Sequence, residues 1–321
     1  MNQVAVARHI VQQSVNVVPH ETALVLTSSE ADQSFATAMV SALREQGAQA
    51  AMVTIENPRA IPHGYLSWEE PEPLVAQLLA AADVAVVYLS TLVVLSKAVA
   101  QAREQGTRLL FIPADYDLSR RVVIEEDLGE LSKLGESVCA TLVSGQRARV
   151  LGEGTELELE LPGRAFFDDA RVINSGDVDF FPGGMWNVVP RPESVNGIVR
   201  LGASAYPLGR LASPIMLRFE GGRIVTIEGG WEAKAWKRWL ESFADDRVFE
   251  FSHLSGGLAR CAAVIGHDWE DLISRGSVLI SGGESVLYGG RNAARGHFDA
   301  IVPDATVEVD GHAILAAGDY I

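Results

Sequence analysis

The stretch of the chain with the clearest chemical potential is residues 296–302, an apolar run that contains a histidine and an aspartate two positions apart. Side chains alternate between the two faces of a β-strand, so His297 and Asp299 are predicted to point the same way. An imidazole beside a carboxylate makes two thirds of the two-histidine, one-carboxylate site that binds non-haem Fe(II). Such pairs also arise by chance, so this pair needs a third ligand before it indicates a metal.

Two of the seven histidines are candidates for that third ligand. His253 lies among small residues, where backbone or a ligand can approach closely. His267 precedes a predicted helix, where a polar residue is expected to cap the helix or face solvent. On spacing alone, His253 is only slightly favoured over His267.

Composition excludes several classes of function. A length of 321 residues suggests two domains, and a net charge of −16 argues against nucleic acid or an anionic membrane as a partner. Only Cys139 and Cys261 are present, which implies no disulfide framework and favours a reducing cytoplasm. Neither a signal peptide nor an apolar run of membrane-spanning length is expected.

The first half of the chain predicts a Rossmann-like parallel α/β domain over residues 1–146. Apolar strands at 23–27, 50–55, 84–89 and 108–112 alternate with helices at 31–46, 73–82 and 93–104, and a helix at 128–144 closes the domain. The turn after the first strand, residues 28–32, has no glycine and contains Glu30 and Asp32. Dinucleotide binding is therefore not expected there.

The second half, residues 147–321, predicts a β-rich α+β domain that holds the metal. Period-two alternation begins at Arg147, and hairpins are predicted around residues 220–222 and 310–311. Two helices are expected within this domain, at 232–243 and near 269–275. Residues 174–196 are rich in Gly, Pro, Asn and aromatics, which suits an ordered loop at the mouth of a binding site.

Several segments of the second half resemble a known family. These segments are 154–164, 181–197, the hairpin 214–230, and the stretches 251–258, 281–283 and 296–311. Together they are similar to the family that joins thermophilic-type leucyl aminopeptidases to 2,5-dihydroxypyridine 5,6-dioxygenase. The resemblance implies a Rossmann-like domain followed by a metal-binding catalytic domain.

Two departures within the resemblance favour its dioxygenase branch. The peptidase branch uses two metals and extra carboxylates, but Gly184 and His253 stand where that branch has glutamates. The dioxygenase pattern of two histidines and one aspartate carries over to His253, His297 and Asp299. The resemblance thus implies a mononuclear Fe(II) site with open positions for substrate and O₂.

The resemblance also leaves the acid/base residue open. The branch has a histidine in its first domain, and the nearest match in this chain is Leu95. Tyr288, Arg291 and Asn292 precede the predicted metal strand and could supply donors, and His63 of the first domain is another candidate. The candidates divide into residues for proton transfer and residues for holding a flat ring. The first group is His63, Tyr288 and Arg291, and the second is Trp186, Asn187 and Asn292.

The function that the sequence predicts is an extradiol-like, ring-cleaving dioxygenase. Its substrates would be O₂ and a small hydroxylated N-heterocycle such as 2,5-dihydroxypyridine, and its product would be of the N-formylmaleamate type. A cytoplasmic homo-oligomer is expected. Two alternatives remain: a metal-dependent aminopeptidase, and a metal-free binding module in which His297 and Asp299 form a buried hydrogen-bonded pair.

Overall fold

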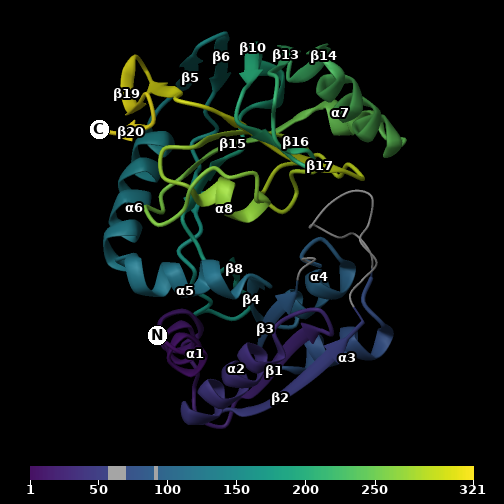
Figure 1. Ribbon diagram of the computed structural model, residues 1–321, viewed down its shortest axis with the longest axis vertical. Coiled ribbons are helices and arrows are strands. Elements are labelled where there is room, and N and C mark those ends of the chain that lie inside the picture. The colour runs from purple at the N-terminus through teal and green to yellow at the C-terminus, as the bar shows by residue number, and fades with distance from the viewer. Residues whose placement is uncertain (57–69, 90–92) are drawn as a thin grey trace. The chain divides into compact units, whose positions relative to one another are not determined.

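The computed structural model describes residues 1–56, 70–89 and 93–321, and it divides the chain into two compact units (Figure 1). Unit 1 comprises Met1–Glu126 and Asp168–Gly183. Unit 2 comprises Asp127–Phe167 and Gly184–Ile321. The chain therefore leaves unit 1, returns to it for a short segment, and leaves it again.

Unit 1 is built on a parallel sheet with the strand order β2-β1-β3-β4-β8. The strands are β1 (Thr22–Ser28), β2 (Gln49–Ile55), β3 (Val84–Leu89), β4 (Arg108–Pro113) and β8 (Val178–Phe180). The helices are α1 (Gln3–Ile10), extended by the π-helical turn η1 (Val11–Val15), α2 (Gln33–Glu45), α3 (Pro73–Ala81), α4 (Lys97–Glu104) and α5 (Tyr116–Glu125). α1 packs against α2 and α5, whereas α3 packs against α4.

The parallel α/β prediction for this part of the chain is confirmed. Every residue of β3 is buried, as its unbroken apolar sequence predicted for a strand covered on both faces. The Asp32 carboxylate accepts hydrogen bonds from the first amides of α2 and so caps the N-terminus of that helix. The helix predicted from residue 93 begins at Lys97, because the Ser96 hydroxyl caps it there.

Unit 2 contains two antiparallel sheets and three α-helices. The eight-stranded sheet runs β14-β13-β10-β6-β5-β18-β19-β20, and the seven-stranded sheet runs β12-β11-β17-β16-β15-β9-β7. The strands of the first are β5 (Arg147–Gly152), β6 (Thr155–Glu160), β10 (Asn196–Leu201), β13 (Ile215–Glu220), β14 (Arg223–Gly229), β18 (Thr306–Val309), β19 (His312–Ala316) and β20 (Asp319–Tyr320). Those of the second are β7 (Phe166–Phe167), β9 (Met185–Val188), β11 (Ser204–Ala205), β12 (Gly209–Arg210), β15 (Phe251–Gly257), β16 (Val278–Gly283) and β17 (His297–Val302). The helices are α6 (Leu128–Ser144), α7 (Trp231–Ser242) and α8 (Asp268–Ile273), with the 3₁₀ turns η2 (Pro192–Ser194) and η3 (Asp246–Phe249).

Both predicted hairpins are present. β13 and β14 are joined by Gly221 and Gly222, and β18 and β19 by Asp310 and Gly311. All four turn residues have positive φ, which is the backbone geometry that matches the twist of a two-residue hairpin. Glycine reaches it without strain, and aspartate is one of the few other residues that tolerates it.

The unit boundaries differ from the predicted division at residue 146. α6 packs against β7 and β9 of unit 2, and Gly135 lets the Phe167 ring approach the helix so closely that a Cβ there would lie 2.5 Å from it. Residues 168–183 return to unit 1, where β8 pairs with β4. A helix that follows a strand does not reveal which sheet it packs on, so sequence order alone misplaced the boundary.

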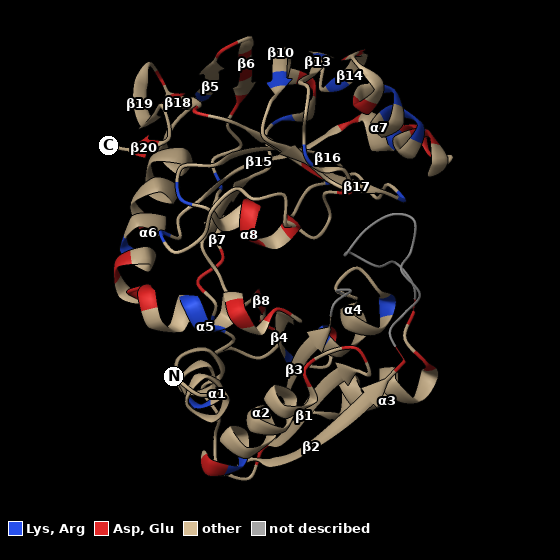
Figure 2. Cartoon of the chain, viewed as in Figure 1, with Lys and Arg blue, Asp and Glu red and all other residues tan. Residues whose placement is uncertain are grey.

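Charge is nearly absent from the middle of the seven-stranded sheet. Asp299 is the single Asp, Glu, Lys or Arg residue in β15, β16 and β17, whereas charged residues are frequent in helices such as α6 and α7 (Figure 2). A lone buried carboxylate needs compensating partners. None of the helices within the described residues is both long and apolar enough to cross a membrane.

Candidate metal centre

The candidate site lies on one face of the seven-stranded sheet. Ser255 on β15 pairs with Asn187 on β9, and Ser281 on β16 pairs with Asp299 on β17. His253 stands two residues before Ser255, and His297 two residues before Asp299, so each shares a face with its neighbour. Neighbouring strands thus bring these polar side chains together, although 44 positions of the chain separate His253 from His297.

His253, His297 and Asp299 converge on one point. One ligand atom from each lies within 4.8 Å of the others, and all three residues are buried. Nε2 of His297 is 3.4 Å from Asp299 Oδ2, and Nε2 of His253 is 3.8 Å from Asp299 Oδ1. The structure thus brings the three predicted ligand residues together, and metal binding by them stays a prediction.

The His297 ring is oriented by the backbone. Its Nδ1 is 2.8 Å from the carbonyl oxygen of Glu284. A carbonyl oxygen can only accept, so Nδ1 carries a proton, and in the neutral ring Nε2 presents its lone pair toward Asp299. That Nε2 is buried and has no hydrogen-bond partner.

The His253 ring also directs its Nε2 toward Asp299, but a side chain rather than the backbone orients this ring. Its Nδ1 lies 2.6 Å from the Ser255 hydroxyl, and its Nε2 is again buried without a hydrogen-bond partner. The Ser281 hydroxyl donates a hydrogen bond to Asp299 Oδ1. Each of the three residues is therefore held by a further group that does not itself point into the site.

The protonation states follow from burial and from the neighbouring charges. Burial lowers the pKa of His253 to about 3, against the attraction of Asp299. Burial opposes ionisation of Asp299, but its contacts with His297 and its proximity to His253 lower its pKa to about 2. Burial also lowers the pKa of His297, yet Asp299 and the Glu284 carboxylate outweigh it and raise that pKa.

These observations test whether a metal ion fits. Two buried imidazole nitrogens without partners, facing an ionised carboxylate, are costly to leave unsatisfied. A divalent cation would satisfy all three groups at once. The Ser255 hydroxyl and the Glu284 carbonyl, which contact the Nδ1 atoms of the two rings, are typical of the groups that orient metal-ligating histidines. Two imidazoles and one carboxylate on one side of an ion form the facial triad of non-haem Fe(II). The donor set thus fits Fe(II).

Tyr288 lies directly against the two imidazoles. Its half-buried ring is 3.9 Å from the centre of the His253 ring and 5.8 Å from that of His297. Phe166 stacks on Tyr288 at 6.2 Å. Tyr288, which was predicted to transfer protons, therefore lies beside the two candidate ligand histidines.

Two side chains hold the loop that carries Tyr288 by hydrogen bonds, and the sequence did not reveal this role for either of them. Glu284 accepts hydrogen bonds from the amides of Val286 and Leu287, while its second carboxylate oxygen is buried without a hydrogen-bond partner. The Asn292 amide donates to the carbonyls of Gly283 and Arg247. Asn292 was predicted to contact substrate, but these bonds give it a role in holding the loop.

Trp186 and Asn187 were both predicted to contact substrate, but neighbouring residues of a strand face opposite ways. Trp186 is fully buried on the other face of the sheet, where its indole donates to the Tyr320 hydroxyl. Asn187 is on the metal-site face, but its amide is fully buried and bonded to Ser255 and to the Met185 carbonyl. The structure thus gives Trp186 a core position and Asn187 a position behind His253.

The remaining candidates are spread more widely. Arg291 is exposed on the same loop as Tyr288, and His63 lies outside the described residues. His267 caps α8, as its place before a helix predicted. Leu95 lies in the turn before α4 of unit 1.

Ser255, Ser281 and Glu284 were not predicted as site residues, although strand alternation from His253 would have pointed to Ser255.

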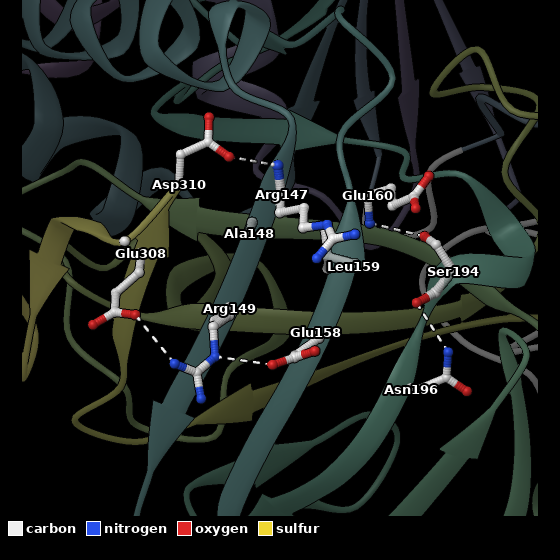
Figure 3. A pocket seen from close by; sticks show the side chains of 11 residues that line it. Arg147, Ala148, Arg149, Glu158, Leu159, Glu160, Ser194, Asn196, Glu308 and Asp310 are labelled. Carbon is white, nitrogen blue, oxygen red and sulfur yellow. Dashed lines mark hydrogen bonds and ion pairs between the residues drawn. The ribbon is translucent and has the colours of Figure 1, made fainter.

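A second concave region lies away from this centre, on the outer face of the eight-stranded sheet. It is a hollow of about 460 Å³ over β5, β6 and β18 (Figure 3). Arg149 forms ion pairs there with Glu158 and Glu308, at 3.1 and 3.6 Å. Three of its charged side chains are thus paired with one another, and no predicted metal ligand is among its described lining residues.

Comparison with known proteins agrees with this architecture. A curated 2,5-dihydroxypyridine 5,6-dioxygenase of Pseudomonas putida KT2440 is 28% identical over 158 residues, which span 46% of this chain and 45% of that protein. The chain thus aligns with less than half the length of this relative.

Solved structures share the fold over nearly the whole chain. A structure of 2,5-dihydroxypyridine dioxygenase from Pseudomonas putida KT2440 superposes with a TM-score of 0.85 at 21% identity, covering 99% of this chain and 96% of the other. Wild-type AmpT from Thermus thermophilus gives a TM-score of 0.71 at 15% identity, covering 99% and 98%.

The sequence model of one family matches almost the entire chain, from residue 4 to residue 321. Its description is 2,5-dihydroxypyridine 5,6-dioxygenase. The resemblance stated from the sequence segments is confirmed by this match, and the chain belongs to the 2,5-dihydroxypyridine 5,6-dioxygenase family.

Proposed function

We propose that this protein is an Fe(II)-dependent dioxygenase that cleaves the ring of 2,5-dihydroxypyridine or a close relative between C5 and C6. Its product would be of the N-formylmaleamate type. In such a reaction the C5–C6 bond breaks and both atoms of one O₂ enter the product. Substrate and O₂ together balance the product, so no external reductant is needed.

The observation that carries the proposal is the arrangement of the three ligand residues. The Nε2 atoms of His253 and His297 and the carboxylate of Asp299 are buried and converge on one point, and the Nδ1 protons of both rings are directed away from it. Family membership supports the same reading. A metal-free binding module would have no need for two unpartnered imidazole nitrogens beside a carboxylate.

Fe(II) at this site would supply the one-electron chemistry that O₂ requires to react with an aromatic ring. The residues of the chain have separate tasks. Asp299 contributes negative charge that offsets the charge of the ion, and the two histidines must stay unprotonated at Nε2 to bind it. Activity should therefore fall in acid, because protons compete with the metal for His297, whose pKa is raised.

Tyr288 is proposed to line the space next to the ion. Its ring already lies against the His253 imidazole, so a flat substrate bound at the metal would meet this ring or displace it. Aromatic pairs contribute about 0.5–1.5 kcal/mol beyond the burial of their surface, which is enough to orient a ring. Tyr288→Leu should therefore raise KM by about 2- to 10-fold, while iron content stays at the wild-type level.

The direct test combines metal analysis with oxygen uptake. Protein purified without air and loaded with Fe(II) should hold about one iron per chain, as one facial triad requires, and should consume O₂ with 2,5-dihydroxypyridine. His297→Ala should lose iron and O₂ uptake together, whereas His267→Ala, which removes the N-cap of α8, should keep both. If His297→Ala retained its iron, the assignment of the site would be wrong.

A metal-dependent aminopeptidase is the alternative, and the backbone at Gly184 bears on it. Gly184 has φ +108°, and a Cβ there would lie 3.1 Å from Leu131 Cδ1. The backbone at this position is therefore poorly suited to the glutamate that a two-metal site would need. Release of an anilide from an aminoacyl-anilide without O₂, in protein loaded with Zn²⁺ or Co²⁺, would favour the peptidase instead.

A further inference from the structure

We propose that Asn187 and Ser255 form a relay that locks His253 into the tautomer with its proton on Nδ1, and that this relay sets the metal affinity of the site. Asn187 and Ser255 are then positioning residues, since neither has a ligand atom in the metal cluster. The inference about metal affinity rests on the proposed metal site. The inference about the tautomer is independent of the metal site, because it can be tested in metal-free protein.

The first step concerns the orientation of the Asn187 amide. One end of this amide is 3.1 Å from the carbonyl oxygen of Met185. A carbonyl oxygen cannot donate, so the amide NH₂ must lie at that end. The amide oxygen of Asn187 therefore faces the other way, toward Ser255.

The second step fixes the Ser255 proton. Its hydroxyl is 2.7 Å from Asn187 Oδ1, and an amide oxygen accepts only. The single hydroxyl proton of Ser255 is thus committed to Asn187. The lone pairs of the hydroxyl remain for the partner on its other side.

The third step transfers this constraint to the metal ligand. His253 Nδ1 is 2.6 Å from the Ser255 hydroxyl, which can now only accept from it. Nδ1 must carry the proton, and the Nε2 lone pair is left facing Asp299. All three residues have 0% exposure, so bulk water cannot substitute for any member of the relay.

Different groups therefore fix the ring orientation and the Nδ1 proton of the two histidines. His297 is held by a backbone carbonyl, which no side-chain substitution removes. His253 depends on a side chain from another strand, because Asn187 and Ser255 are directly opposite each other across β9 and β15. This difference makes His297 an internal control for any experiment on His253.

The experiment measures the tautomer of each histidine in metal-free, ¹⁵N-histidine-labelled protein by long-range ¹H–¹⁵N correlation. Resonances are assigned by their loss in His253→Gln and His297→Gln. In the wild type, both rings should carry the proton on Nδ1. In Asn187→Leu, Ser255 loses its acceptor and can donate to Nδ1, so His253 should move toward the Nε2-protonated form while His297 is unchanged.

A second measurement is Co²⁺ affinity, from the visible spectrum in competition with a chelator. Loss of a group that orients a ligand typically lowers metal affinity about 10- to 100-fold, and this is the loss expected for Asn187→Leu and Ser255→Ala. Ser255→Thr keeps the hydroxyl and should retain the wild-type tautomer. Ser277→Ala removes a buried hydroxyl that bonds to the Leu272 carbonyl instead, so it should bind Co²⁺ as the wild type does.

The outcomes separate the two proposals. If Asn187→Leu and Ser255→Ala keep both the Nδ1-protonated His253 and wild-type Co²⁺ affinity, the relay is overturned. If the wild type has the expected tautomer but binds no Co²⁺, the relay survives and the proposed metal-dependent function fails. If all variants, including Ser277→Ala, lose Co²⁺ equally while the His253 tautomer is unchanged, the relay is again overturned, since the loss is then general destabilisation.

Discussion

Asp268 carries a strongly perturbed carboxyl group near the candidate metal centre. Burial, followed by the charges of Asp271 and Asp299, raises its pKa from 3.8 to about 7. Between these two values the unfolded chain is ionised while the folded chain still holds the proton. The contribution of Asp268 to the free energy of unfolding therefore falls as pH rises from about 4 to 7, and is constant above that range.

Asp268→Asn should remove this penalty. Relative to the wild type, the metal-free variant should gain about 1–2 kcal/mol of stability at pH 8, with its partial exposure allowed for, and nothing at pH 4. Urea unfolding at the two pH values measures the difference. Glu228→Gln, at an exposed position on β14, should show no such dependence. An equal effect of Asp268→Asn at both pH values would contradict the raised pKa.

At the scale of single residues, the sequence predicted which side chains converge better than it predicted the residues around them. His297 and Asp299 share a face because they are two apart on a strand, and that follows from local geometry. Asn187 and Ser255 meet only because β9 pairs with β15, a long-range register that no local pattern encodes. Trp186 was predicted at the site because residues 174–196 were interpreted as a loop at its mouth, whereas the structure places Trp186 in β9, on the face away from His253.

At the scale of elements, close packing of the seven-stranded sheet depends on small residues in β15. A Cβ at Gly256 would lie 2.7 Å from the Trp186 indole, which is fully buried across the strand pair. The small residues around His253 were interpreted as space that lets backbone or a ligand approach closely. At Gly256, on the face opposite the ligands, the structure shows that the room is taken by this tryptophan.

Gly256→Ala should therefore destabilise the protein by overpacking, at a cost of about 1–3 kcal/mol, because neither the sheet nor the indole can easily move. Gly152→Ala is the matched control. Its added Cβ would find its nearest neighbour at 3.8 Å, an ordinary contact, so no loss is expected. Urea unfolding followed by tryptophan fluorescence compares the two variants. A cost for Gly256→Ala no larger than that for Gly152→Ala would show that the sheet adapts.

Alternation of strands and helices was enough to predict the parallel sheet of unit 1, since buried parallel strands are unbroken apolar runs. The two hairpins of unit 2 followed from their turn residues. The order of strands in the seven-stranded sheet did not follow from the sequence, because long connections join them: residues 258–277, which contain α8, lie between β15 and β16, and residues 284–296 lie between β16 and β17. Loops of that length carry no signal of which strands they bring together.

At the scale of the whole molecule, tryptophan reports on one unit more than on the other. Unit 2 contains five of the six tryptophans, namely Trp186, Trp231, Trp236, Trp239 and Trp269. The sixth, Trp68, lies outside the described residues and can be replaced by phenylalanine. Fluorescence of Trp68→Phe protein then follows the unfolding of the unit that contains the candidate metal ligands.

A metal that binds only the folded chain must stabilise it by mass action. Zn²⁺ has no redox chemistry, so it is a suitable probe. At a free concentration one hundred times its Kd it should stabilise unit 2 by about 2.7 kcal/mol, which raises the midpoint of the fluorescence transition by roughly 5–10 °C. The same addition to His297→Ala in the Trp68→Phe background should leave its midpoint unchanged, since Nε2 of His297 is one of the three converging ligand atoms. An equal shift in both proteins would mean that the ion binds elsewhere, and the site built from β15 and β17 would then have to be abandoned as its location.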